Sequence, residues 1–368
     1  MGTKAPAPVP GNGEAKPAAE TRPGEIRSFT EILQRLAERR DLSGAEAATA
    51  VDQMVDGEVG DAQAAAFLMA LRVKGETSEE IAGLAEALYR RALLVETADP
   101  SQLVDIVGTG GDGLGTFNVS TTAAFVAAGA GVRVAKHGNR AASSRCGSAD
   151  VLEALGVRVD LGAADVAACI EEVGLGFMLA ALHHPASGRV AGVRKALGVR
   201  TVFNFLGPLT NPARAGRLVL GVSAAEYVHV LAEALAHMGC ERALVVRGAD
   251  GMDELSVTGP STVVEVSGGR VGRPQSFDPE SCGLVRHRLE ALAGGGPEEN
   301  AAITRSVLAG MRGAPRDSVL LNAAAALNVA GVAASLREGV EQARRSIDSG
   351  GAMAVLDAMV AFTGRTRG

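Results

Sequence analysis

The chain has 368 residues, a formal net charge of −6 and no tryptophan. This length allows one large domain or two of moderate size, with a core that needs no disulfides. The acidic balance disfavours nucleic acid or an anionic membrane as a partner. The four cysteines are widely spaced and form no CxxC pair, which indicates free thiols. No apolar run is long enough to span a bilayer, so we expect a cytoplasmic protein.

The N-terminal part divides into two segments of different composition. Prolines recur through residues 1–27 among alanine, glycine and glutamate, and such a composition is typical of a disordered tail. From Ser28 the apolar residues fall at helical intervals. Residues 28–98 therefore predict a helical domain of about four helices. Capping-box spacing marks three helix starts, at Ser28 and Glu31, Ser43 and Glu46, and Thr77 and Glu80.

After Pro100, strand and helix patterns alternate to the end of the chain. This alternation predicts an α/β domain over residues 101–365, with a central, mostly parallel sheet covered by helices. The candidate strands are Leu103–Val107, Val132–Ala135, Ala243–Val246 and Thr262–Val266, and the candidate helices are Val151–Leu155, Asn300–Leu308 and Ser318–Ala334.

A glycine-rich run, residues 108–113, directly follows the first strand. Glycines let backbone N–H groups approach a phosphate closely, although a tight turn after a strand is the alternative interpretation. The run matches the dinucleotide pattern GxGxxG, but no helix opens at once and no acid follows about 20 residues later. It is not a P-loop, because no Gly-Lys-Ser/Thr follows.

Two further polar motifs precede helical runs. Residues 118–122, Asn-Val-Ser-Thr-Thr, suit either capping of a helix or binding of a phosphate at its N-terminus, and the two roles can coexist. Residues 136–140, Lys-His-Gly-Asn-Arg, follow a strand, where α/β sheets bind ligands. A solvated basic turn is the alternative, but small polar residues continue through Ser144 and Ser148, which favours a functional loop.

Asp253 and Glu254 are adjacent acids in a predicted loop. Carboxylate oxygens suit Mg²⁺, which usually shares its coordination with substrate phosphates and water. Neighbouring acids are also common on protein surfaces, so this pair is a weak signal when taken alone.

Taken together and in order, these motifs resemble those of the anthranilate phosphoribosyltransferase family, from about Phe29 to about Ala361. The resemblance includes Lys74–Thr77 in the helical part and Leu321–Ala324 near the C-terminus. The matching blocks are Gly108–Asp112, Asn118–Thr121, Lys136–Arg140, Gly147–Asp150, Phe203–Pro212 and Asp253–Ser256.

The resemblance implies a small helical domain, which a segment near residues 186–212 joins, beside an α/β phosphoribosyl-binding domain. It implies a homodimer that uses Mg²⁺ to join phosphoribose from phosphoribosyl pyrophosphate to the amine of anthranilate, in tryptophan biosynthesis. The chain departs from the family pattern at Leu179–Ala181 and at Ser187, beside the acceptor. Alternatives are transfer to another aromatic amine, phosphorolysis of a nucleoside on the same scaffold, or a non-catalytic binding homologue.

The resemblance also implies a role for individual residues. The catalytic pair would be Lys136 and Arg194. Ser120, Asp253 and Glu254 would hold magnesium. Anthranilate would contact Gly108, His137, Asn139 and Arg194. The phosphoribosyl pyrophosphate site would comprise Gly108, Gly111, Asp112, Thr116, Asn118, Val119, Ser120, Thr121, Lys136, His137, Gly138, Asn139, Ser144 and Ser148.

Overall fold

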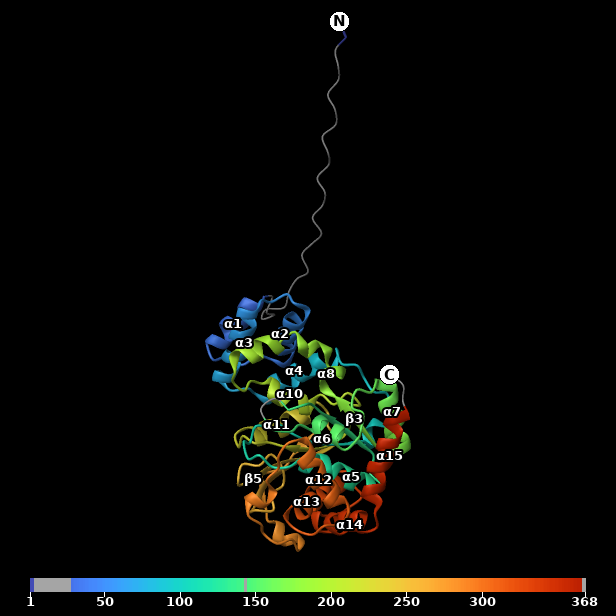
Figure 1. Cartoon of the computed structure of the whole chain (residues 1–368). Helices are drawn as coiled ribbons and strands as arrows, with labels where there is room; N and C mark the ends of the chain where they lie inside the picture. Colours follow the sequence, from blue (N-terminus) through green and yellow to red (C-terminus); the bar gives the residue numbers. More distant parts are fainter. Residues whose placement is uncertain (3–27, 142–143, 366–368) are drawn as a thin grey trace.

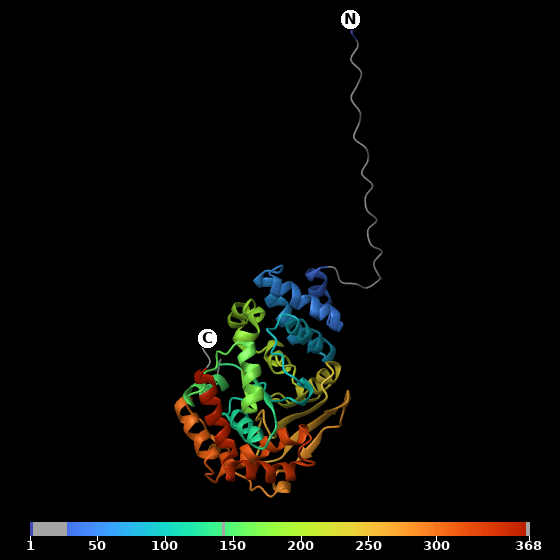
Figure 2. The same ribbon diagram turned by 90° about the vertical axis from the view of Figure 1, so that its right-hand side faces the viewer.

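The computed structural model describes residues 1–2, 28–141 and 144–365, and the tail predicted over residues 1–27 otherwise lies outside the described residues. A small helical bundle stands at one end of a larger α/β domain (Figure 1). A quarter turn keeps the bundle at that end, with the long C-terminal helices at the other (Figure 2). The expected fold class, a small N-terminal helical domain plus an α/β domain with a mostly parallel sheet, is confirmed.

The start of two bundle helices is fixed by the predicted capping boxes. Ser43 with Glu46, and Thr77 with Glu80, exchange the reciprocal side-chain and backbone hydrogen bonds of that motif. Glu80 is fully buried, lies 2.9 Å from the Lys74 ammonium and also accepts the Leu42 N–H. One carboxylate therefore ties three segments together. The bundle helices are α1 (Phe29–Ala37), α2 (Gly44–Asp56), α3 (Asp61–Lys74) and α4 (Ser78–Tyr89).

The central sheet has the strand order β3-β2-β1-β4-β5-β6-β7, and β8 pairs with β6. The first five strands are parallel, whereas β6 is antiparallel to β5, β7 and β8. The order reverses between β1 and β4, which is where open α/β sheets bind ligands. The strands are β1 (Val104–Gly108), β2 (Val134–Gly138), β3 (Leu175–Leu179), β4 (Arg217–Gly221), β5 (Arg242–Gly248), β6 (Ser261–Ser267), β7 (Arg270–Val271) and β8 (Gln275–Phe277).

Helices cover both faces of this sheet, because alternate strand residues are apolar on each side. Val219 and Leu244 belong to a core shared with α5 and α13, whereas Leu218 and Leu220 join a core shared with α10, α11 and the bundle. The α/β helices are α5 (Val119–Gly129), α6 (Ser148–Ala154), α7 (Ala163–Val173), α8 (Ala180–His183), α9 (Ala191–Leu197), α10 (Phe203–Leu209), α11 (Tyr227–His237), α12 (Pro297–Leu308), α13 (Ala314–Val329), α14 (Leu336–Asp348) and α15 (Gly351–Arg365).

Several predicted boundaries are wrong, and two of them have a clear physical reason. The strand predicted at Val132–Ala135 is β2, and its parallel pairing with β3 continues to Gly138, so the Lys-His-Gly motif lies inside the strand. The helix predicted at Ser318–Ala334 is α13, and it ends at Val329. Gly331 adopts a φ of 75°, and its N–H bonds the Asn328 carbonyl, a left-handed turn that stops a helix.

The packing of α2 on α4 depends on a glycine. A Cβ added at Gly83 would lie 2.0 Å from the Gly44 carbonyl oxygen, and both atoms belong to the close crossing of these helices. We expect Gly83→Ala to lower the free energy of unfolding by about 1–3 kcal/mol, as overpacking does. Urea denaturation measures this loss. Gly364→Ala in α15, where nothing lies within 4 Å of the added methyl group, is the control, and an equal effect of both changes would contradict the argument.

Candidate functional site at the topological switch point

The carboxyl ends of β1 and β4 meet at two paired glycines. Gly108 is the register partner of Gly221, and both lie against Asp253. A Cβ at Gly108 would lie 2.1 Å from the Asp253 carboxylate, and one at Gly221 would lie 1.5 Å from its backbone oxygen. Gly110 and Gly111 adopt φ values of 66° and 74°, which favour glycine. This loop therefore needs glycine for close approach and for its turn.

The two acids contact the other predicted motifs through the backbone. Asp253 accepts the Gly110 N–H at 2.6 Å, and Glu254 accepts the Ser120 N–H at 2.9 Å. Both acids lie on the connection between β5 and β6, so they reach the site from the opposite half of the sheet. The fold thus gathers the glycine loop, the start of α5 and the acidic pair at one point.

The electrostatics of this pair suit a divalent cation. Burial, reinforced by the charge of Asp112, raises the pKa of Asp253 to about 6. Burial and the neighbouring Asp253 carboxylate raise the pKa of Glu254 well above its usual range. Within the described ranges no group of three or more histidines, cysteines or acids forms a metal site. Mg²⁺ commonly uses only one or two carboxylates beside water and phosphate, so these oxygens fit it.

The start of α5 resolves the choice between capping and another role for Asn118. Its side chain makes no capping hydrogen bond. Instead it donates to the Cys146 carbonyl at 3.4 Å and accepts from Asn300 at 2.9 Å. Val119 and Thr121 are buried, so a ligand at this helix start would meet their main chain only. Thr116, further back in the loop, forms a β-bridge with Ala293.

The motif on β2 supplies a buried cation and a neutral imidazole. Lys136 is 3% exposed, and its ammonium donates to the Ile106 carbonyl at 2.6 Å. Burial lowers the pKa of Lys136, while the carboxylates of Asp105 and Glu254 oppose that shift. The His137 ring lies within hydrogen-bond distance of the Gly207 carbonyl, 3.0 Å from Nδ1, and burial lowers the pKa of His137 to about 3. Its imidazole is therefore neutral near pH 7.

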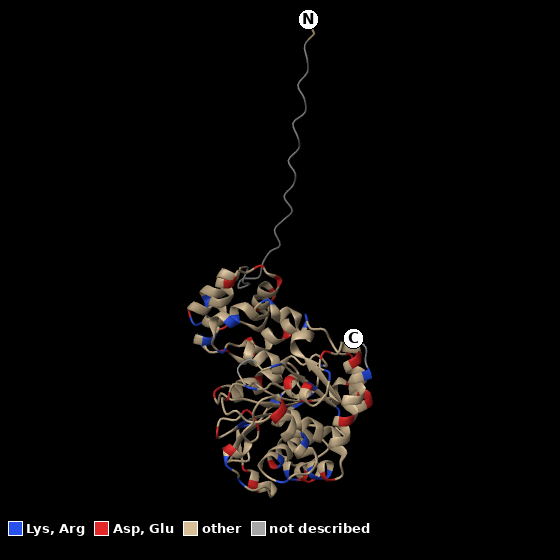
Figure 3. Ribbon diagram, in the orientation of Figure 1, with Lys and Arg blue, Asp and Glu red and all other residues tan. Residues whose placement is uncertain are grey.

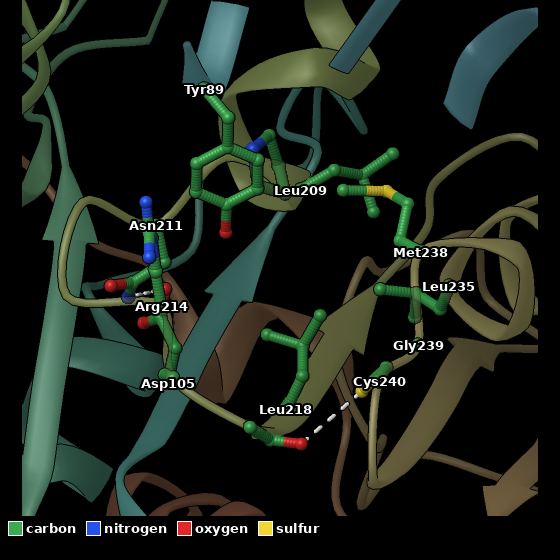
Figure 4. A pocket seen from close by; sticks show the side chains of 13 residues that line it. Tyr89, Asp105, Leu209, Asn211, Arg214, Leu218, Leu235, Met238, Gly239 and Cys240 are labelled. Carbon is green, nitrogen blue, oxygen red and sulfur yellow. Dashed lines mark hydrogen bonds between the residues drawn. The ribbon is translucent and has the colours of Figure 1, made fainter. Parts of the chain in front are cut away.

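Sequence reasoning gave no role to two supporting residues, although one of them lies in the Phe203–Pro212 block. Asp105, fully buried on β1, accepts the His137 N–H at 3.2 Å. Asn211 donates from one amide nitrogen to Asp105 at 2.8 Å and to the Ala135 carbonyl at 2.7 Å. Both side chains form one wall of a cavity of about 240 Å³ at the amino ends of the strands (Figure 4). An acid inside the apolar run Leu103–Val107 was the signal that could have revealed this pair.

A second cavity adjoins the carboxyl end of β2. It has a volume of about 310 Å³ and is lined by His137, Asn139 and Arg194. The Arg194 guanidinium, on α9, lies 5.4 Å from the centre of the Phe203 ring, and burial lowers its pKa. The Nε2 atom of His137 is buried and has no hydrogen-bond partner among the described residues. Ala180, Ala181 and Ser187, where the chain departs from the family pattern, also line the cavity.

The segment from β2 to the start of α6 fixes the backbone of Asn139 by a hydrogen bond. The Ser148 hydroxyl donates to the Asn139 carbonyl at 3.2 Å, and a Cβ at Gly138 would lie 2.2 Å from that hydroxyl oxygen. The Ser144 hydroxyl donates to the Cys146 carbonyl at 3.4 Å. Asn139 and Ser144 are exposed, so both can meet a ligand that enters here.

Comparison with known proteins covers almost all of the described chain. Residues 100–353 match the glycosyl transferase family a/b domain, and residues 30–92 match the helical bundle domain of the same family. The anthranilate phosphoribosyltransferase of Parvibaculum lavamentivorans is 54% identical over 92% of this chain and 98% of its own length. That of Rubrobacter xylanophilus is 53% identical over the same shares. The chain belongs to the anthranilate phosphoribosyltransferase family.

Solved structures agree with this membership. The anthranilate phosphoribosyltransferase of Thermus thermophilus is 49% identical, with a TM-score of 0.85 over 90% of this chain and 99% of its own. The Saccharomyces cerevisiae enzyme, solved in complex with PRPP and Mg, is 31% identical, with a TM-score of 0.84 over 92% and 98%. No helix in the described part of this family member has the length and apolarity needed to cross a membrane.

The Asn211 contacts generate a stability prediction for this family member. Asn211→Leu removes the donor shared by Asp105 and the Ala135 carbonyl and leaves two buried acceptors short of a partner. We expect the free energy of unfolding to fall by about 1–3 kcal/mol, measured by urea denaturation. A double-mutant cycle with Asp105→Val is the control, because additive losses would show that the two side chains do not interact energetically.

Proposed function

We propose that this chain transfers phosphoribose from phosphoribosyl pyrophosphate to the amine of anthranilate, with Mg²⁺, and releases pyrophosphate in tryptophan biosynthesis. One observation carries the proposal. The glycine loop, the Ser120 N–H and the Asp253–Glu254 pair converge beside a cavity lined by Arg194. The names of the relatives, and the yeast enzyme solved with PRPP and Mg, support the same activity.

The donor substrate would lie between the glycine loop and the start of α5. Backbone N–H groups at such positions bind phosphate oxygens, and no side-chain charge is needed for that contact. Magnesium, held by Asp253, Glu254 and the Ser120 hydroxyl, would stabilise negative charge on the pyrophosphate leaving group. The remaining residues proposed for the donor are Gly108, Gly111, Asp112, Thr116, Asn118, Val119, Thr121, His137, Gly138, Asn139, Ser144 and Ser148.

Lys136 would act on the donor through the positive charge of its side chain, which is buried between β2 and β1. Its ammonium is held on the Ile106 carbonyl inside the sheet, so its field reaches the donor through a low-dielectric medium rather than through water. A fixed positive charge there would attract the pyrophosphate group both in the bound donor and as it departs. The side chain needs no proton transfer for this role.

The acceptor would occupy the cavity between His137, Asn139 and Arg194, beside Gly108. The guanidinium can bind the anthranilate carboxylate through a charge-assisted pair of hydrogen bonds. An aromatic amine is uncharged near pH 7, so its nitrogen can attack C1 of the ribose without prior deprotonation. The C–N bond forms as the C1–O bond to pyrophosphate breaks, and the amine proton leaves afterwards to solvent. Alignment of the two substrates supplies the rest of the rate enhancement.

We also propose the assembly that serves this reaction. The cleft would separate residues 28–98, together with the segment near 186–212, from the rest of residues 101–365. In support, α9 and α10 share an apolar core with α1–α4. A homodimer in the cytoplasm rests on the family resemblance, and light scattering of the purified chain tests its oligomeric state.

The activity itself has a direct test. The purified chain should convert phosphoribosyl pyrophosphate and anthranilate to the phosphoribosyl amine, detected as loss of anthranilate fluorescence, only when Mg²⁺ is present. Asp253→Asn combined with Glu254→Gln should remove most turnover while the circular dichroism spectrum stays unchanged. Normal turnover by this variant at limiting Mg²⁺ would contradict the metal assignment. Preference for another aromatic amine in a parallel panel would direct attention to Ala180, Ala181 and Ser187.

The two proposed substrate sites should respond to different substitutions. Arg194→Ala should raise the KM for anthranilate by about ten- to a hundredfold, because a charged hydrogen bond contributes roughly 1.5–3 kcal/mol. The KM for phosphoribosyl pyrophosphate should barely change. Lys136→Ala should show the opposite pattern. Steady-state kinetics with each substrate varied in turn measure both effects, and equal damage to both substrates by Arg194→Ala would make Arg194 a structural residue.

A further inference from the structure

A third cavity, of about 310 Å³, lies on the other side of the glycine loop and is lined by three arginines. Arg72 comes from α3 of the bundle, Arg200 from the link between α9 and α10, and Arg247 from β5. All three side chains are partly buried. Gly111 and Ser223 complete the wall that faces the proposed donor site. The cavity therefore draws positive charge from three elements that are far apart in the sequence.

None of these arginines has an acidic oxygen within 4 Å among the described residues, and each donates to a neutral oxygen instead. Arg72 donates to the Tyr227 hydroxyl at 2.5 Å, Arg200 to the Gly110 carbonyl at 2.6 Å, and Arg247 to the Ser223 carbonyl at 2.9 Å. Elsewhere acidic and basic residues are interspersed over both domains (Figure 3). Each guanidinium has five N–H donors, so most donors around this cavity are available to an anion.

The backbone of Gly110 separates the cavity from the proposed donor site. The Gly110 N–H faces Asp253, whereas the Gly110 carbonyl accepts from Arg200 and from the Ser223 hydroxyl at 2.9 Å. A Cβ at Gly111 would lie 1.4 Å from an Arg200 nitrogen, so the guanidinium lies directly on the loop. An anion that leaves the donor site across this loop meets the arginines next.

We propose that this arginine cavity is a second anion site, which takes inorganic pyrophosphate after its release from the donor site. The proposal rests on the proposed function, because that reaction produces pyrophosphate beside the loop. Guanidinium groups match phosphate oxygens with forked hydrogen bonds, and three of them supply the counter-charge that a diphosphate needs without a metal. Asp112 is the one carboxylate among the residues that line the cavity, and it faces the loop rather than pairing with an arginine.

The test is isothermal titration of the intact protein with sodium pyrophosphate in the presence of EDTA. Wild type should bind pyrophosphate without a divalent cation, and Arg247→Met should weaken that binding by about tenfold or more, as loss of a charged hydrogen bond does. Arg247 is the best site to change because it does not contact Tyr227 as Arg72 does. The matched control is Arg273→Met, which removes an exposed arginine before β8 and should bind as wild type does.

A second titration separates this cavity from the donor site. With Mg²⁺ present, Arg247→Met should bind phosphoribosyl pyrophosphate within about twofold of wild type, since Arg247 donates to the Ser223 carbonyl, which is not part of the proposed donor site. Absence of metal-free pyrophosphate binding in wild type would overturn the proposal. So would an equal loss of phosphoribosyl pyrophosphate affinity in Arg247→Met, because the arginines would then belong to the donor site. The anthranilate assay is independent of both titrations, so failure of the proposed function would be seen separately.

Discussion

The site depends on the close approach of Asp253 to the ends of two parallel strands. Where the strand order reverses, the chain after β1 leads to α5 on one face of the sheet and the chain after β4 leads to α11 on the other, and a crevice forms between the two connections. Gly108 and Gly221 remove the side chains that would fill this crevice, and the backbone of the β5–β6 connection enters in their place. A methyl group at either glycine would collide with Asp253. The position of both acids, and hence of any cation between them, follows from these two absent side chains.

The second half of the site depends on a different constraint, the attachment of the bundle. Arg194 lies on α9, which contacts α3 of the bundle, whereas His137 and Asn139 extend from β2. The acceptor cavity is therefore assembled from two bodies that each have their own helices. The departures at Ala180, Ala181 and Ser187 lie in the connection between them, on small side chains that leave space.

Sequence reasoning succeeded where a local pattern fixes a local structure. The capping boxes at Ser43 and Thr77 and the glycine run after β1 describe contacts between close neighbours in the chain. It failed where pairing between distant segments decides the outcome. The strands β3 and β4 went unrecognised, and β2 was placed two residues early, because parallel register is set by a neighbouring strand that is remote in sequence.

The candidate site divides in the same way. The motifs named Gly108, Ser120, Asp253 and Glu254 in advance, because the family resemblance preserves their order. Arg200 and Asn211 were missed, since their importance arises from the backbone carbonyls that they reach across the fold. Asp105 is a charged residue in an otherwise apolar strand, and this pattern could have indicated that it has a buried hydrogen-bond partner. Buried polar groups need partners, so an isolated acid in a strand points to a donor elsewhere in the chain.

The hydrogen bonds that Asp253 and Glu254 accept from Gly110 and Ser120 have a consequence for turnover. These carboxylates occupy the N–H groups that the diphosphate of the proposed donor would use. On that proposal, arrival of the donor would exchange one set of anionic oxygens for another, and its net affinity would be the difference between two similar contacts. The acids would bind the N–H groups again as pyrophosphate left. Asp253 and Glu254 would thus compete with pyrophosphate for the same donors and favour its release.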